Sequence, residues 1–260
     1  MWFLVLYLVL LLGGTGAVPL TQPRIVGGWE CQEHSQPWQV SVHDCRDPMC
    51  GGVLIDPKWV LTAAHCKSQH LQVWVGVHNL ENLEDPAQFA EVSVGFPHPS
   101  YNVSDNQPYL IPDEDYSSDI MLLRLKEPVK ITHAVKVLAL PTTDPEVGST
   151  CISSGWGSID PSGTVYPDDL QCIDMKIFKN DVCAKTSIQK ITESMLCAGN
   201  LEEGKDICLG DSGGPLVCNG VLQGIMSSNH YPCGKIGLPA VYTRVFSYVT
   251  WIRETMAANP

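Results

Sequence analysis

A lone serine lies in a glycine-rich segment near the end of the chain, Gly210-Asp211-Ser212-Gly213-Gly214-Pro215. A hydroxyl is a weak nucleophile until a neighbouring base removes its proton, and the oxyanion that follows its attack on a carbonyl needs fixed N–H donors. In this turn the backbone N–H groups of Gly210 and Ser212 can supply those donors. The segment therefore predicts an acyl-transfer nucleophile at Ser212, and it requires a base elsewhere in the chain.

Candidates for the base and for the acid that orients it lie earlier in the sequence. His65 stands in Thr62-Ala63-Ala64-His65-Cys66, and Asp119 opens the run Asp119-Ile120-Met121-Leu122-Leu123, which is typical of a buried strand. Each motif alone is a weak signal, because most histidines and strand-start aspartates are structural. Together with the glycine-rich turn, and in this chain order, they predict a triad in which His65 is the base for Ser212 and Asp119 orients His65.

These motifs, in the order His, Asp, Ser, resemble those of the trypsin-type (chymotrypsin-family) serine peptidases, and the resemblance runs from Ile25 to the end of the chain. The leader, the long segment that ends at Asp119 and the segment 205–212 make it resemble the tissue, or glandular, kallikreins more narrowly. The resemblance implies a hydrolase, specifically a serine endopeptidase. It also implies partners of three kinds: protein or peptide substrates, an activating trypsin-like protease, and inhibitors such as serpins.

The expected fold class is all-β. Short apolar runs such as 38–42 and 71–75 stand between glycine, proline and aspartate turns, which is typical of many short strands. The resemblance implies two six-stranded antiparallel β-barrels, roughly 25–136 and 137–244, with the active site in the cleft between them. A C-terminal helix is expected at about 246–258, where apolar side chains recur at helical spacing.

Two segments precede this peptidase domain, which is expected to span 25–260. Residues 1–17 are predicted to be a signal peptide, because the apolar run 2–12 is too short to cross a bilayer and is followed by small residues. The protein is therefore expected to be secreted, extracellular and not held in a membrane. Residues 18–24 form a prosegment that ends in Arg24. The resemblance implies a zymogen cleaved after Arg24, whose new Ile25 amine pairs with the carboxylate of Asp211.

The chain has 11 cysteines, a number that indicates an oxidising compartment. By resemblance, ten of them form five disulfides: Cys31–Cys172, Cys50–Cys66, Cys151–Cys218, Cys183–Cys197 and Cys208–Cys233. Zinc is the competing use of cysteines, but no CxxC pair occurs, so we predict no metal and no cofactor. Cys45 is left over. It could remain a free or capped thiol, form a mixed disulfide, or link two copies of the chain.

The resemblance also implies where the substrate binds. Asp206 takes the place at the base of the S1 pocket, which predicts cleavage after arginine and, less well, lysine. Tyr116 is expected to line the S2 subsite. The family usually reads Ser-Trp-Gly along the pocket wall, but this chain has Ser227-Ser228-Asn229, with the bulky Ile207 beside the pocket acid and Ala240 where glycine or serine is common. The extra asparagine side chain and the lost tryptophan could narrow S1.

A rival reading comes from another functional class: a secreted binding or carrier protein on a peptidase scaffold, with weak or no turnover. The altered S1 mouth and the unpaired Cys45 favour it, whereas an intact triad, oxyanion turn and activation sequence favour the enzyme.

The remaining features concern the surface. Asn102-Val103-Ser104 is a glycosylation sequon in a secreted chain, which predicts a glycoprotein. The formal net charge is −12, which excludes the basic surface of a nucleic-acid binder. Val77 and Ala87 occupy what resemble the ligand positions of the trypsin calcium loop, so no calcium is expected there. Inhibition by zinc remains open.

Overall fold

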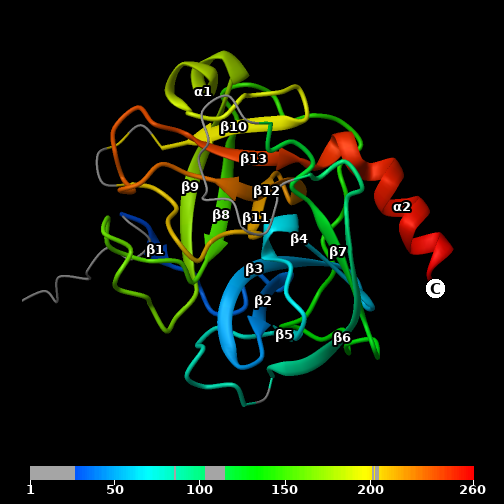
Figure 1. Ribbon diagram of the computed structural model, residues 1–260. Helices are drawn as coiled ribbons and strands as arrows, with labels where there is room; N and C mark the ends of the chain where they lie inside the picture. Colours follow the sequence, from blue (N-terminus) through cyan, green and yellow to red (C-terminus); the bar gives the residue numbers. More distant parts are fainter. Residues whose placement is uncertain (1–26, 85, 103–114, 201, 203–204) are drawn as a thin grey trace, which may run out of the picture.

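The computed structural model describes residues 27–84, 86–102, 115–200, 202 and 205–260. Two β-barrels stacked on each other make up most of this part of the chain, and a helix lies against their side (Figure 1). The signal peptide, the prosegment, Arg24 and Ile25 lie outside the described residues. So does most of the segment between Asn102 and Asp119.

The first barrel is closed by six antiparallel strands in the order β2-β3-β4-β7-β6-β5. Its strands are β2 Gln39–Asp44, β3 Asp47–Asp56, β4 Trp59–Thr62, β5 Leu71–Val75, β6 Gln88–Pro97 and β7 Met121–Leu125. In β5 the buried side chains of Leu71, Val73 and Val75 alternate with the half-buried Gln72 and Trp74, which is the period-two pattern of a strand with one face in a core. The predicted strand at 71–75 is thus confirmed.

The second barrel is a sheet in the order β1-β9-β10-β13-β12-β11-β8, closed by a further pairing between β8 and β9. Its strands are β1 Trp29–Glu30, β8 Thr150–Gly155, β9 Gln171–Phe178, β10 Met195–Gly199, β11 Pro215–Cys218, β12 Val221–Ser228 and β13 Ala240–Arg244. The closing pair runs antiparallel from Thr150–Lys176 to Gly155–Gln171. The ring is thus closed by the six strands β8 to β13, and β1 is an additional strand paired with β9. The all-β class with two six-stranded barrels is therefore confirmed.

The described residues contain four helical segments: η1 Ala64–Cys66, α1 Asn180–Thr186, η2 Val245–Tyr248 and α2 Val249–Ala258. The predicted C-terminal helix is present as η2 and α2. Its buried residues Tyr248 and Ile252 belong to the same apolar cluster as the interior of the first barrel. In the part of the chain that is described, no helix has both the length and the apolar character needed to cross a membrane.

The two ends of the chain cross between the barrels. The strand β1 precedes the first barrel in sequence but pairs with β9 of the second sheet, and Cys31 beside it is bonded to Cys172. The helix α2 follows the second barrel but packs on the first. The sequence-based division at residue 136 assigns β1 to the first barrel, and the structure differs there because this short strand finds its hydrogen-bond partners in β9. These crossings link the two barrels to each other on either side of the surface between them.

Candidate active site

Asp119 lies just before β7 and is held from four directions. Its Oδ2 accepts a hydrogen bond from His65 Nδ1 at 2.7 Å and its Oδ1 accepts one from the backbone N–H of His65 at 3.0 Å. The hydroxyl of Ser227, at the end of β12, donates to Oδ2 at 2.6 Å, and that of Thr243 in β13 donates to the Asp119 carbonyl at 2.6 Å. Asp119 is 3% exposed. The acid therefore joins both barrels at one buried point.

His65 lies in η1, directly after β4, and its ring faces Asp119. A carboxylate can only accept, so Nδ1 carries the proton and Nε2 has the lone pair in the neutral ring. Burial lowers the pKa of His65, whereas the negative charge of Asp119 and its hydrogen bond to the ring raise it. The two raising effects outweigh burial, so the pKa of His65 lies above its ordinary value. Burial raises the pKa of Asp119, and its pairing with His65 outweighs this, so that the acid stays ionised. The pair has the electrostatics of a general base supported by a fixed anion.

The turn that carries Ser212 is pressed against the segment that carries His65. The backbone N–H of Gly51 donates to the Ser212 carbonyl at 2.7 Å. Gly213 has a positive φ of 77°, and a Cβ built on it would lie 2.2 Å from Thr62 Oγ1. Thr62 ends β4 and precedes His65 by three residues. Only glycine allows the backbone at position 213 to lie this close to Thr62. This contact brings the serine turn to the segment that leads into His65.

The backbone amides of this turn divide into two groups. Those of Asp211, Gly213 and Gly214 donate to carbonyl oxygens at distances of 3.1, 2.8 and 3.0 Å. Among the hydrogen bonds within the described residues, none uses the amides of Gly210 or Ser212. Gly210 has a φ of 99°, a conformation that favours glycine. The two amides expected to form the oxyanion hole are therefore available to a ligand.

Asp211, next to the serine, is buried and points away from it into the second barrel's loops. Its Oδ1 accepts from the Gly157 N–H and its Oδ2 from the Cys208 N–H, both at 2.9 Å. A Cβ on Gly155 or Gly157 would lie within 2.4 Å of this carboxylate, so both glycines are required for it to fit. Burial raises the pKa of Asp211 to about 6, although the hydrogen bonds from the two N–H groups lower it. The Ile25 amine expected as its counter-charge lies outside the described residues.

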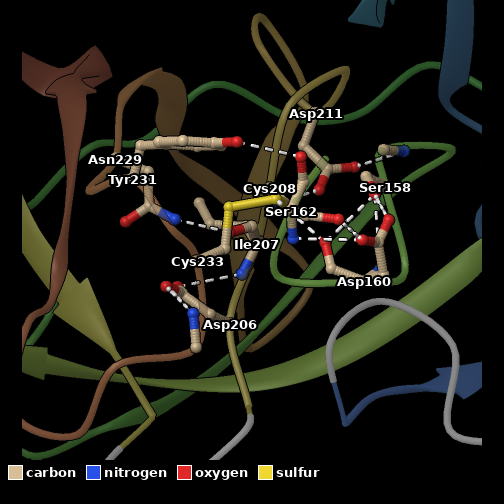
Figure 2. The surroundings of a disulfide bond; sticks show 12 residues. Ser158, Asp160, Ser162, Asp206, Ile207, Cys208, Asp211, Asn229, Tyr231 and Cys233 are labelled. Atoms are coloured by element: carbon tan, nitrogen blue, oxygen red, sulfur yellow. Dashed lines mark hydrogen bonds between the residues drawn. A yellow bond between two sulfur atoms is a disulfide. The ribbon is translucent and has the colours of Figure 1, made fainter. Parts of the chain in front are cut away.

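Asp206 and Asn229 lie together beside the Cys208–Cys233 disulfide (Figure 2). Asp206 is 5% exposed, and its carboxylate accepts from the backbone N–H groups of Ile207 at 2.9 Å and Gly234 at 3.0 Å. Burial raises the pKa of Asp206 to about 6, although hydrogen bonds from Gly234, Asn229 and Ile207 lower it. The fully buried Ala240 packs in one apolar cluster with Ile207. The residues expected to form S1 are thus gathered in one place.

A small cavity adjoins the His65–Asp119 pair. Tyr116, which is 8% exposed, lines it together with His65 and Tyr101. Ser228 also lines it, and its hydroxyl accepts a hydrogen bond from Gln189 Nε2 at 2.6 Å. This is the position expected of an S2 subsite next to the base.

Three groups of potential metal ligands occur among the described residues, and each has its donor atoms within 4.8 Å of one another: Cys50/His65/Cys66, Glu30/His78/Asp169 and Asp44/Cys45/His70. The cysteines of the first group form a disulfide. In the second, Glu30 contacts His78 at 3.3 Å and Asp169 accepts from Asn79 at 2.7 Å, so the carboxylates already have protein partners. The third lies where the turn between β2 and β3 meets His70, just before β5. Val77 and Ala87 pack in an apolar cluster, and their side chains carry no oxygen.

The five disulfides in the structure join the pairs that the resemblance implies. Cys45 is exposed and is the free cysteine of the described residues. Asn102 is also exposed, whereas the rest of its sequon lies outside the described part.

The contacts that four residues make in the site carry no recognisable signal in the sequence. Ser227 and Thr243 bond to Asp119 from positions 108 and 124 residues away, and Gly51 and Thr62 receive the serine turn. Ser227 is expected from the sequence only as a substrate-binding residue. Its hydrogen bond to Asp119 accompanies the antiparallel pairing of β12 with β13, which places the end of β12 close to Thr243.

Comparisons with known proteins agree with this geometry. Residues 25–252 match the protein family described as Trypsin. The chain is 58% identical to human "Kallikrein-2" over 261 residues and 54% identical to mouse "Kallikrein-1" over 260 residues, with all of each chain covered. The structure is similar to that of neuropsin, a serine protease expressed in the limbic system of mouse brain, with a TM-score of 0.81, 45% identity and coverage of 88% of this chain and 98% of that one. The chain thus belongs to the trypsin family of serine endopeptidases and is, within that family, a tissue kallikrein.

Proposed function

We propose that this serine endopeptidase is secreted as a zymogen and cleaves peptide bonds, and esters, preferentially after arginine and less well after lysine. The observation that carries the proposal is the fixed group made by Asp119, His65 and the Ser212 turn, with buried Asp206 nearby. A carboxylate at the base of a pocket favours a guanidinium, whose fork of N–H donors matches its two oxygens, over an ammonium.

In the proposed mechanism, Ser212 Oγ attacks the substrate carbonyl while His65 Nε2 takes its proton. Asp119 holds the ring in the required tautomer and stabilises the imidazolium that forms. The amides of Gly210 and Ser212 bind the oxyanion. His65 then gives its proton to the leaving amine, which departs as the acyl-enzyme forms. Water attacks the acyl-enzyme, His65 acts as base again, and release of the acid product returns the proton to Ser212.

Activation is proposed to follow cleavage after Arg24 by a trypsin-like protease. The new amine of Ile25 would then reach Asp211, whose carboxylate is buried with only neutral N–H partners among the described residues. A buried carboxylate without a cation is costly, and for this reason its pKa is raised. A positive charge placed there would keep Asp211 ionised and fix the turn that carries Gly210 and Ser212.

The proposed partners are proteins or peptides cut at basic residues, inhibitors such as serpins, and, through exposed Cys45, a second copy of the chain. The proposed subsite residues are Tyr116 in S2 and, around S1, Asp206, Ser227, Ser228, Asn229 and Ala240. Glycosylation is proposed at Asn102.

The test is hydrolysis of matched small substrates with Arg, Lys, Tyr or Phe at P1 by protein cleaved after Arg24. We expect Arg to be preferred over Lys and both over the aromatic residues, and we expect Asp206→Asn to remove the preference. Ser212→Ala should lose nearly all turnover on every substrate. Turnover without selectivity for basic residues would refute the assignment of Asp206, and labelling of Ser212 by a serine reagent without any turnover would favour the binding-protein alternative.

A further inference from the structure

The side chain of Asn229 reaches across to the segment that carries Asp206 and forms a bridge to it. Asn229 follows β12, and its Nδ2 donates a short hydrogen bond to the carbonyl oxygen of Ile207, which adjoins Asp206 in sequence. In Figure 2 the Asn229 amide nitrogen faces Ile207, on the same side of the Cys208–Cys233 disulfide as the Asp206 carboxylate. That disulfide joins the two segments close to this contact, so the asparagine amide is a second link between them.

The bridge uses the same kind of contact that an arginine side chain would make. Asn229 Nδ2 is an N–H donor aimed at a backbone carbonyl next to Asp206, and its hydrogen bonding also contributes to the environment of the Asp206 carboxylate. A guanidinium entering the pocket would need these acceptors for its own five N–H groups. The asparagine amide and the substrate cation therefore compete for one set of acceptors.

The bridge is also incompletely satisfied. Asn229 Oδ1 is buried and has no hydrogen-bond partner among the described residues. A buried acceptor without a donor costs free energy, so the bridged arrangement is weaker than a fully paired one. A charged guanidinium bonds to a carboxylate more strongly than a neutral amide does. These two facts make the bridge displaceable by a substrate rather than a permanent block.

We infer that Asn229 is a specificity-determining residue whose side-chain amide occupies the S1 pocket of the free enzyme as an internal competitor and lowers turnover after arginine. The inference rests on the proposed role of Asp206 in S1. Substrates with a small uncharged P1 residue do not reach Asp206 and do not need the amide to move. Asp206 alone would create a large difference in kcat/KM between substrates with basic and with small P1 residues. Asn229 therefore makes that difference smaller.

The experiment compares activated wild-type protein with Asn229→Gly and Asn229→Ala. The alanine variant removes the amide while it keeps a Cβ and the ordinary backbone restraint, so it separates loss of the bridge from added backbone freedom. Asn219→Gly is the matched control, because Asn219 is exposed, lies in the turn between β11 and β12 and has a φ of 52° that glycine adopts readily. Active-site titration gives the concentration of folded enzyme in every case.

Two quantities are measured for each protein: kcat/KM on matched substrates with P1 Arg or P1 Ala, and the inhibition constant of benzamidine, an amidinium probe for the base of S1. We expect both Asn229 variants to raise kcat/KM for P1 Arg by about tenfold or more, the factor of one competing hydrogen bond. Benzamidine should tighten by a similar factor. Hydrolysis after P1 Ala should change less than about twofold, and Asn219→Gly should resemble wild type throughout.

Adding Asp206→Asn to the wild-type and Asn229→Gly backgrounds distinguishes failure of the inference about Asn229 from failure of the proposed role of Asp206 in S1. If benzamidine binds wild type as tightly as the Asn229 variants, and Asp206→Asn weakens it in both backgrounds, the inference about Asn229 is overturned while the role of Asp206 stands. If Asp206→Asn leaves hydrolysis after arginine unchanged in both backgrounds, the proposed P1 preference itself fails. A gain with Asn229→Gly that Asn229→Ala does not share would attribute the effect to backbone freedom and would also overturn the inference.

Discussion

At the scale of single residues, the site depends on buried charges that are held by neutral hydrogen-bond donors. Asp119 stays ionised because His65 and the Ser227 hydroxyl bond to its carboxylate, whereas Asp206 and Asp211 have neutral backbone partners and a pKa of about 6. The difference corresponds to their proposed roles. Asp119 already has its partner within the described residues, whereas each of the other two acids is expected to gain a cation, from the substrate or from the chain's own new amine.

The first prediction concerns the hydroxyl of Ser227. Ser227→Ala removes the 2.6 Å hydrogen bond to Asp119 Oδ2. A hydrogen bond to a charged group contributes about 1.5–3 kcal/mol, so we expect kcat to fall by about tenfold to a hundredfold with a smaller change in KM. The measurement is steady-state kinetics on a P1 Arg substrate. Ser228→Ala is the control, because that hydroxyl contacts Gln189 instead, and an equal loss in both variants would contradict a specific role for Ser227.

The second prediction concerns pH. The pKa of Asp206 is about 6 in the empty pocket, so below that pH a proton competes with a cationic ligand for the carboxylate. Benzamidine should therefore bind about tenfold more weakly at pH 5 than at pH 8, measured by calorimetry with the Ser212→Ala variant. His65 and Asp211 also titrate near this site, so Asp206→Asn in the same background reports their contribution. If that variant has the same pH dependence, the effect does not belong to Asp206.

At the scale of elements, the site is made by strand ends and tight turns from both barrels. The end of β4 leads into His65, the start of β7 follows Asp119, and the end of β12 brings Ser227 to both. The serine turn is held by glycines that permit close backbone approach. Gly213 in particular lies against Thr62 and the Gly51 carbonyl, so the absence of a side chain allows the serine turn to approach the segment that precedes His65.

A third prediction follows from that contact. Gly213→Ala would place a Cβ 2.2 Å from Thr62 Oγ1 and 2.5 Å from the Gly51 carbonyl at a φ of 77°, so the turn must shift and activity should fall by at least about a hundredfold. Gly220→Ala is the matched control: its φ of 75° is nearly the same, but nothing lies within 4 Å of its Cβ. It should lose about 1 kcal/mol of stability and keep its activity. The measurements are thermal unfolding and kcat/KM, and equal losses of activity would contradict the packing argument.

Much of this arrangement could be predicted from the sequence, because the triad motifs and the glycine-rich turn are local patterns. The strand at 71–75 and the C-terminal helix also follow from side-chain periodicity. The pairing of β1 with the second barrel could not be predicted, since a two-residue strand has no periodicity. Nor could the contact of Ser227 with Asp119 or that of Asn229 with Ile207. The first depends on long-range strand pairing, and the second on how the segments joined by the Cys208–Cys233 disulfide lie together, neither of which is a local pattern.

At the scale of the whole molecule, the two barrels are tied together by the chain's own ends, and the surface carries one free thiol in its described part. Cys45 lies on the turn between β2 and β3 with a φ of 57°, and its N–H donates to the His70 carbonyl at 3.1 Å. The turn is therefore held by the barrel while its thiol stays exposed, a position from which it can react with another molecule.

The fourth prediction tests that thiol. Protein secreted into an oxidising medium should contain a disulfide-linked dimer on a non-reducing gel, and Cys45→Ser should leave only the monomer. Because Cys45 is exposed and outside both apolar cores, the variant should keep wild-type unfolding temperature and activity. A dimer that persists in Cys45→Ser would point to exchange within one of the five buried disulfides instead.

The central claim is that Ser212 is the nucleophile of a functioning triad, and the most direct test is stoichiometric labelling of activated protein by an organophosphorus reagent, followed by peptide mapping. We predict one label per molecule, on Ser212, with loss of turnover in proportion to labelling and no label on Ser212→Ala. His65→Ala should slow the labelling by several orders of magnitude while the fold is retained. A label on another serine, or full turnover by the labelled protein, would contradict the account.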